Sequence, residues 1–296
     1  MAAPDQYPLS MKVILKRFLL MPAIHIVRKL YYIPGIRKLY HFPVDATDSL
    51  LGRRTELTPP RSKIFVGCGD FQAIGEEFLR YFAELGALKP NEKVLDVGCG
   101  IGRMAVPLTR YLKDGGSYEG FDIVTDGINW CRKKITPNYP HFHFQLSDIY
   151  NKLFNPKGRY KASEYNFPYD KESFDFIFLI SVFTHMLPQD MENYFSQIGR
   201  VLKRGGRCLI TFFLLNKESL KLIDAGLSRL DFKHEFNEYR TIDQDTPEYD
   251  IAYNEEFIRR RFNSYGLNIV EPIHYGSWCG RRSFLSDQDI IIAIKK

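Results

Sequence analysis

Hydrophobic residues recur with two different periods from about residue 71 to the end of the chain. Stripes at helical spacing, such as Phe78, Leu79 and Phe82, alternate with short apolar runs, such as residues 174–180. The stripes predict amphipathic helices, and the runs predict strands that are buried on both faces. Predicted strands cover residues 93–97, 117–121, 142–146, 174–180, 207–215, 267–274 and 289–294, and predicted helices cover 103–112, 127–135, 191–202 and 255–265. Repeated strand–helix units predict a parallel sheet, and the last two strands, with no helix between them, should pair antiparallel.

The first 63 residues follow another pattern. Residues 11–40 contain seven Lys or Arg and no acid, with apolar residues at helical spacing on both sides of Pro22. Pro34-Gly35 is expected to end the second helix, and residues 41–63 are expected to form a linker. Two interpretations stay open: the basic helices bind an anionic membrane surface, or they pack on the main domain with their basic faces in solvent.

Composition changes this picture in two ways. The formal net charge is +6, but residues 1–63 alone carry +7, so the domain predicted over 64–296 is nearly neutral. A domain without a basic surplus does not favour nucleic-acid binding. The five cysteines are scattered and form no CxxC pair. This spacing disfavours a disulfide framework or a metal site and favours a reducing, cytoplasmic location, on a membrane periphery if the extension binds lipid.

A glycine loop follows the first predicted strand and reads Asp96-Val97-Gly98-Cys99-Gly100-Ile101-Gly102. Glycines let the backbone turn tightly and approach a ligand closely, and the loop opens a helix whose first amides are free. A dinucleotide-binding GxGxxG motif would place glycine where Arg103 stands, so a nicotinamide dehydrogenase is disfavoured. An acid before the loop suits a cationic ligand group.

The segment VLDVGCGIGR resembles the first motif of class I S-adenosylmethionine-dependent methyltransferases. The resemblance covers about residues 78–296 and includes the acids that end the second and third strands and the LKRGGR before the fifth. It implies an α/β, Rossmann-like fold with a seven-stranded sheet, an antiparallel final strand and helices on both faces. It also implies S-adenosyl-L-methionine as the cofactor and S-adenosyl-L-homocysteine as its product.

The resemblance also implies a cofactor site at the carboxyl ends of the first four strands. Its members would be Asp96, Gly98, Cys99, Gly100, Gly102, Asp122, Ile123, Asp148, Ile149, Ser181 and Val182. Asp96 would anchor the methionine amine, Asp122 would accept both ribose hydroxyls, and Asp148 would meet the adenine amine. Ser181 and Val182 would border the sulfonium. Cys99 is expected to fill space in the loop and not to act as a nucleophile.

His185 is the candidate catalytic base. It follows the fourth strand in the segment SVFTHM, at the sheet edge where ligands bind, and histidine titrates near neutral pH. In several similar small-molecule methyltransferases a histidine at this place acts as a base, and in many relatives it is structural, so both roles stay open. No [DN]PP[YFW] motif follows the strand, which disfavours methylation of nucleobase amines.

Two insertions are expected to shape the acceptor site, at residues 149–168 and 216–253, with Tyr239 and Tyr253 as candidate substrate contacts. A solvated cap over the cofactor is the other interpretation. The predicted function is methyl transfer to a small-molecule, glycan or lipid-linked acceptor, at a hydroxyl. The alternative function is a catalytically silent S-adenosylmethionine-binding protein that serves a membrane-associated complex.

Overall fold

The computed structural model describes residues 34–51, 54–65, 67 and 69–296. The helices predicted on both sides of Pro22 lie outside these residues. Within the described part of the chain, no helix is both long enough and apolar enough to cross a membrane.

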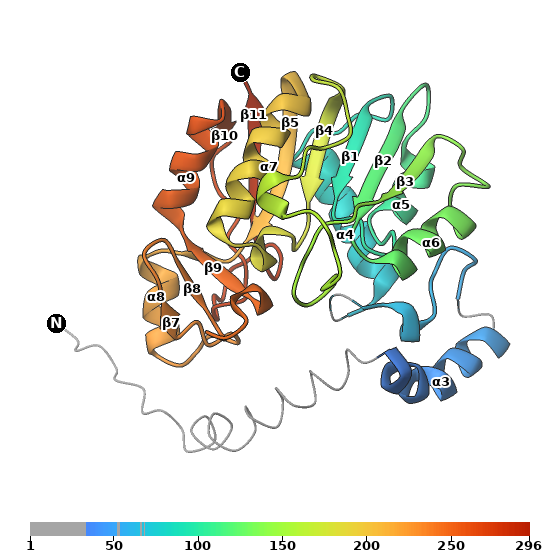
Figure 1. Cartoon of the computed structure of the whole chain (residues 1–296), viewed down its shortest axis with the longest axis horizontal. Coiled ribbons are helices and arrows are strands. Elements are labelled where there is room, and N and C mark those ends of the chain that lie inside the picture. The colour runs from blue at the N-terminus through green and yellow to red at the C-terminus, as the bar shows by residue number, and fades with distance from the viewer. Residues whose placement is uncertain (1–33, 52–53, 66, 68) are drawn as a thin grey trace.

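A seven-stranded sheet forms the centre of the molecule (Figure 1). Across the sheet the order is β10 (Leu267–Ile269), β11 (Asp289–Lys295), β5 (Leu202–Phe212), β4 (Phe174–Leu179), β1 (Lys93–Val97), β2 (Ser117–Asp122) and β3 (Phe142–Leu146). Only β11 runs antiparallel to its neighbours β5 and β10; the remaining pairs in this sheet are parallel. The predicted sheet with an antiparallel final strand is confirmed.

Helices cover both faces of this sheet. On one face lie α4 (Phe71–Glu84), α5 (Ala105–Tyr111) and α6 (Thr125–Lys134), and on the other lie α7 (Pro188–Val201) and α9 (Glu255–Ser264). The Phe82 and Phe178 rings stack at 4.3 Å on the first face, and Phe195 meets Phe262 edge-on at 4.9 Å on the second. The predicted α/β, Rossmann-like class is therefore confirmed.

The segment predicted as a linker, residues 41–63, is helical at its start, because the chain from Pro34 onward forms a helix. Helix α3 (Pro34–Leu50) begins at this proline. A proline in the first turn of a helix loses no hydrogen bond, because the N–H that it lacks would have no partner there. The Asp45 carboxylate then accepts the backbone N–H groups of Arg61 and Ser62, at 2.7 and 3.2 Å, which ties α3 to the short helix η2 (Arg61–Lys63).

A second sheet of four strands was not predicted. Its order is β6 (Leu214–Leu215), β9 (Ile251–Asn254), β8 (Tyr239–Thr241) and β7 (His234–Glu235). With α8 (Lys217–Asp224) and η5 (Pro247–Tyr249), it is built mainly from the predicted insertion 216–253. Each of its strands has two to four residues, too few for an alternating pattern to appear in the sequence.

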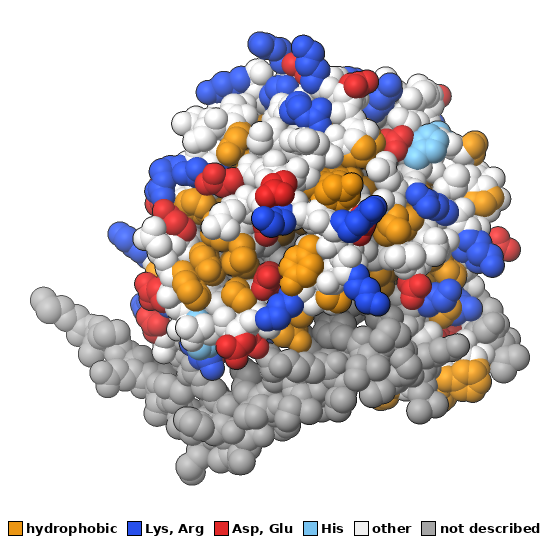
Figure 2. All heavy atoms as spheres, in the orientation of Figure 1, with side chains coloured by type: hydrophobic (Ala, Val, Ile, Leu, Met, Phe, Trp, Pro, Cys, Tyr) orange, Lys and Arg blue, Asp and Glu red, His pale blue; other side chains and the backbone are white. Residues whose placement is uncertain are grey.

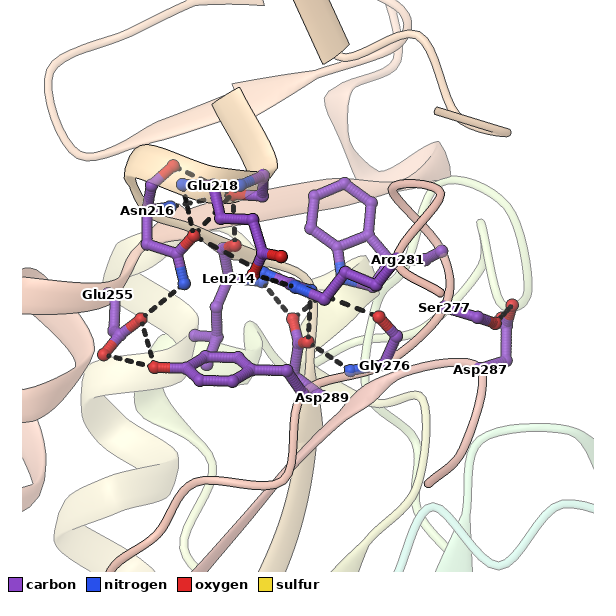
Figure 3. A network of polar contacts seen from close by, with 12 residues as sticks. Leu214, Asn216, Glu218, Glu255, Gly276, Ser277, Arg281, Asp287 and Asp289 are labelled. Atoms are coloured by element: carbon purple, nitrogen blue, oxygen red, sulfur yellow. Dashed lines mark hydrogen bonds and ion pairs between the residues drawn. The ribbon is translucent and has the colours of Figure 1, made fainter. Parts of the chain in front are cut away.

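A buried ion pair joins the two sheets (Figure 3). Asp289 begins β11 and is fully buried. Its carboxylate accepts four N–H groups: the backbone amides of Leu214 and Gly276 at 2.7 Å, the Trp278 indole at 2.8 Å and the Arg281 guanidinium at 3.1 Å. Arg281 also donates to Glu218 of α8 at 2.8 Å. The network fixes the small sheet to the edge where β5 ends and β11 begins.

We expect Arg281→Met to lower the free energy of unfolding by about 3–5 kcal/mol, because it leaves the Asp289 carboxylate buried without its counter-ion. Arg282→Met is the matched control. Its side chain is exposed, so the change should stay within about 0.5 kcal/mol. Chemical denaturation at pH 7 measures both losses.

The loss should also depend on pH. Burial raises the pKa of Asp289 to about 6, although the hydrogen bonds and Arg281 oppose the rise. Removing Arg281 raises the pKa further. The folded variant then holds a proton that the unfolded chain releases near pH 4, so its stability falls as the pH rises. The loss should be smaller at pH 5 than at pH 7, and equal losses at the two values would contradict this account.

Candidate active site

The glycine loop connects β1 to α5 and bends back towards β2. Gly98, Gly100 and Gly102 have φ angles of 84°, 56° and 81°, in the left-handed region that favours glycine. The amides of Gly98 and Cys99 both donate to the Phe121 carbonyl, at 2.9 and 3.0 Å. A Cβ on Gly98 would lie 2.5 Å from Cγ2 of Val182, so the loop also touches the segment after β4.

Asp122 ends β2 and holds the loop from the side. One carboxylate oxygen accepts the Gly100 amide at 2.7 Å and the other accepts the Val124 amide at 2.8 Å. Burial raises the pKa of this carboxyl, and the backbone hydrogen bonds partly oppose the rise. Each oxygen keeps a further lone pair, so the carboxylate still has the acceptors that two ribose hydroxyls require. Ile123 follows it and is partly exposed at the same edge.

Asp96 lies buried beneath the loop, where the Tyr118 hydroxyl donates to it at 2.6 Å. Desolvation raises the pKa of Asp96 well above its ordinary value, the Tyr118 hydrogen bond lowers it, and the charge of Asp122 raises it. Gly120 pairs with Asp96 across the strands, and a Cβ there would lie 2.8 Å from the Tyr118 hydroxyl. The absence of a side chain at Gly120 therefore makes room for this hydroxyl.

Asp148 follows β3 and is less buried than the other two acids. Its carboxylate pairs with the Arg159 guanidinium, which lowers the pKa of Asp148. Arg159 belongs to the insertion 149–168, so an adenine amine at Asp148 would share the carboxylate with this arginine. Ile149 is buried beside it.

Ser181 follows β4 with a φ of 58°, a strained value for a residue other than glycine. Its amide donates to the Thr211 hydroxyl of β5 at 2.8 Å, and its own hydroxyl donates to Gln288 at 3.1 Å. These contacts hold the segment that leads to Val182 at the same sheet edge as the glycine loop.

His185 lies in the short helix η4 (Phe183–His185), and both predicted insertions contact it. Its Nδ1 is 3.0 Å from the Glu248 carbonyl, and the Phe154 ring meets its ring edge-on at 5.8 Å. A carbonyl oxygen can only accept, so Nδ1 carries a proton. In the neutral ring Nε2 is then the acceptor.

The two tyrosines predicted to contact substrate, Tyr239 and Tyr253, are partners across β8 and β9, with ring centroids 6.2 Å apart, but they differ in burial. Tyr253 is fully buried and its hydroxyl donates to the Met186 carbonyl, directly after His185. Tyr239 is half-buried and stacks on Phe236 at 4.7 Å. Contact with an acceptor stays a prediction for both residues.

Cys99 is buried in the loop, and desolvation together with the charges of Asp96 and Asp122 raises the pKa of its thiol. A protonated, buried thiol does not favour nucleophilic chemistry. Tyr118 and the Glu248 carbonyl were not predicted from the sequence. Gly120 is in register with Asp96, and a tyrosine two residues before such a glycine is a signal that could have identified Tyr118. A backbone carbonyl carries no such signal.

The chain matches a known family of protein domains. The methyltransferase-domain family matches residues 70–271, more than half of the chain. Methyltransferase GfsG of Streptomyces halstedii is 28% identical over 138 residues, which cover 46% of this chain and 43% of the relative. The fatty-acid O-methyltransferase of Mycolicibacterium smegmatis is 28% identical over 121 residues, 41% of this chain and 37% of the relative. The matches thus span less than half of these relatives.

A solved structure shares the fold. The PH0226 protein of Pyrococcus horikoshii OT3 aligns with a TM-score of 0.53 at 16% identity, covering 79% of this chain and 95% of that one. The chain belongs to the methyltransferase-domain family. The family and the fold confirm the prediction of a class I S-adenosylmethionine-dependent methyltransferase and of its cofactor, and the roles of the individual site residues stay predictions.

We expect Asp122→Asn to weaken binding of S-adenosylhomocysteine at least about tenfold, because charged hydrogen bonds contribute about 1.5–3 kcal/mol each. Titration calorimetry on the full chain measures the affinity. Asp126→Asn, an exposed acid in the first turn of α6, is the matched control and should bind as the wild type does. Unchanged affinity in Asp122→Asn, or binding of NADH in place of S-adenosylhomocysteine, would contradict the assignment of this acid.

Proposed function

We propose that the chain transfers the methyl group of S-adenosylmethionine to a hydroxyl of a small-molecule, glycan or lipid-linked acceptor, with His185 as the base. The observation that carries this proposal is the bond from His185 Nδ1 to the Glu248 carbonyl, which leaves Nε2 able to take a proton. The bound cofactor supplies a methyl group on a positively charged sulfur. As the acceptor oxygen forms its bond to this methyl group, Nε2 of His185 would take the proton that the oxygen loses, and S-adenosylhomocysteine would be the second product.

The protein's contribution is orientation and proton transfer. Asp96, Asp122 and the glycine loop would hold the cofactor, and His185 lies at the end of the neighbouring strand β4. Orientation lowers a barrier by up to roughly 7–11 kcal/mol in favourable cases. A positioned base adds about 10²–10⁴-fold.

Aromatic side chains favour an acceptor with an apolar body. Phe154 lies against His185, and Phe236 and Tyr239 stack beside the turn that contains Glu248. On the face drawn in Figure 2, hydrophobic side chains gather among charged ones over β9 and the link between β3 and β4. Relatives named as fatty-acid O-methyltransferase and sterol 24-C-methyltransferase are consistent with a lipid-like acceptor.

Two carboxylates favour a neutral hydroxyl over a carboxylate acceptor. Burial and the negative charge of Glu248 raise the pKa of Asp190, in the first turn of α7 after His185. The negative charges of these two side chains would repel an acceptor carboxylate. The same charges would attract an ammonium group, so an amine is the second candidate acceptor.

We expect His185→Gln to lower turnover by about 10²–10⁴-fold, because the attacking hydroxyl loses its base. Affinity for S-adenosylhomocysteine should change less than about twofold, since His185 is not among the residues expected to hold the cofactor. His143→Gln, an exposed histidine on β3, is the control. Methyl transfer from labelled S-adenosylmethionine to a fatty alcohol, a sterol, an oligosaccharide, a fatty acid and an alkylamine measures turnover. Full activity of His185→Gln would refute the base role, and cofactor binding without transfer to any of them would favour the silent binding protein.

We also propose that the basic extension brings the enzyme to an anionic membrane surface. Helix α3 and the residue after it support this, because Tyr40, Val44 and Leu51, at and after the end of the basic segment 11–40, are 72%, 41% and 57% exposed. With about 3.6 residues per turn, these three positions lie on one side of a helix that is continued by one residue to Leu51. Each Lys or Arg near such a surface contributes about 1 kcal/mol, and buried apolar area adds to that. The competing interpretation is that the extension packs on the domain.

We expect the triple variant Tyr40→Ser, Val44→Ser and Leu51→Ser to sediment less with phosphatidylserine vesicles than the wild type does. The control triple variant changes Phe284, Val270 and Leu227, exposed apolar residues elsewhere, to Ser and should bind as the wild type does. Binding should weaken in 1 M salt, where the Debye length falls to about 3 Å, and on phosphatidylcholine. Equal binding of both variants, or no binding by the wild type, would refute the membrane proposal.

A further inference from the structure

The carbonyl that orients His185 belongs to an irregular turn between β8 and β9. Thr241, the last residue of β8 before this turn, has a fully buried side chain. The Thr241 hydroxyl is 2.9 Å from the Pro247 carbonyl and 3.1 Å from the Asp250 carbonyl. These two carbonyls flank Glu248 on both sides, so a single buried hydroxyl holds the short stretch that presents the Glu248 oxygen.

Other contacts hold the same turn from its exposed end. The Asp243 carboxylate accepts the amides of Asp245 and Thr246 at 2.9 and 3.0 Å. Lys152 of the insertion 149–168 donates to the Asp245 carbonyl at 2.6 Å. Water can replace an exposed partner, whereas the carbonyls at Thr241 would lose a buried one. Loss of the Thr241 hydroxyl should therefore disturb the turn more than loss of one of these exposed contacts.

The position of this turn decides the tautomer of His185. A neutral imidazole carries its proton on either nitrogen, and the hydrogen-bond partner selects which. An acceptor at Nδ1 fixes the proton there and leaves the Nε2 lone pair for a substrate proton. If the Glu248 carbonyl moves away, Nε2 can hold the proton and the ring cannot accept at that atom. The Phe154 ring and the carboxylates of Asp190 and Glu248 also border this region.

We infer that Thr241 is a positioning residue that acts through the Glu248 carbonyl to keep the His185 proton on Nδ1. The insertion 216–253 would thus keep Nε2 of His185 free to accept a proton, in addition to its predicted role in the acceptor site. This inference rests on the proposed function in which His185 is the base.

Nitrogen-15 NMR of the imidazole groups in the full chain tests the inference without an acceptor. The unprotonated nitrogen of a neutral ring resonates far downfield of the protonated one, and loss of signals in His185→Gln identifies His185. We expect unprotonated Nε2 in the wild type and a shift towards protonated Nε2 in Thr241→Val, which keeps the shape but lacks the hydroxyl. Thr241→Ser should restore the wild-type signals. Thr136→Val, which removes a hydroxyl bonded to the Phe142 carbonyl at the start of β3, should leave them unchanged.

Two results would overturn the inference: a folded Thr241→Val with the wild-type tautomer, or a wild type with its proton on Nε2. If Thr241→Val does not fold, Thr241→Ala removes the same hydroxyl with a smaller side chain, and an unchanged tautomer there decides against the inference. Thr241→Val should also lower kcat without changing affinity for S-adenosylhomocysteine. The expected tautomers together with full turnover in His185→Gln would refute the base role alone, because the NMR signals do not depend on activity.

Discussion

The contact between the Asp122 carboxylate and the Gly100 amide determines the shape of the whole cofactor edge. It requires β2 to end next to the loop that follows β1, so the two strands must pair in parallel and in register. It also requires left-handed backbone at the glycines, because a side chain there would strain the turn or strike Val182. Loop, acid and the segment after β4 are therefore parts of one packed unit.

The small sheet supplies contacts to His185 and to the residue after it. Its turn contributes the Glu248 carbonyl to His185, and its strand β9 (Ile251–Asn254) sends the Tyr253 hydroxyl to the next carbonyl along. Asp289 of β11 fixes this sheet to the main one, because its carboxylate accepts the Leu214 amide of β6 and pairs with Arg281. A predicted base on a short helical turn is thus held by residues more than sixty positions later in the chain.

Much of this could be predicted from sequence, where local patterns carry the information. Apolar runs predicted the seven strands of the main sheet, and the glycine spacing predicted the loop that lies with Asp96 and Asp122 at the ends of β1 and β2. Partners set by tertiary packing could not be predicted in this way. The small sheet has strands too short for a periodic signal, and the Tyr118 hydroxyl reaches Asp96 because Gly120 leaves room for it. Helix α3, which begins at Pro34, extends into the segment predicted as a linker.

The central claim is that one sheet edge holds the cofactor and presents its methyl group to His185. A crystal structure of the full chain with S-adenosylhomocysteine tests it most directly. The account predicts the ribose hydroxyls on the Asp122 carboxylate, the methionine amine above Asp96 and the sulfur facing Nε2 of His185 across a space open to an acceptor. A ligand bound away from the glycine loop, or a sulfur directed away from His185, would contradict it.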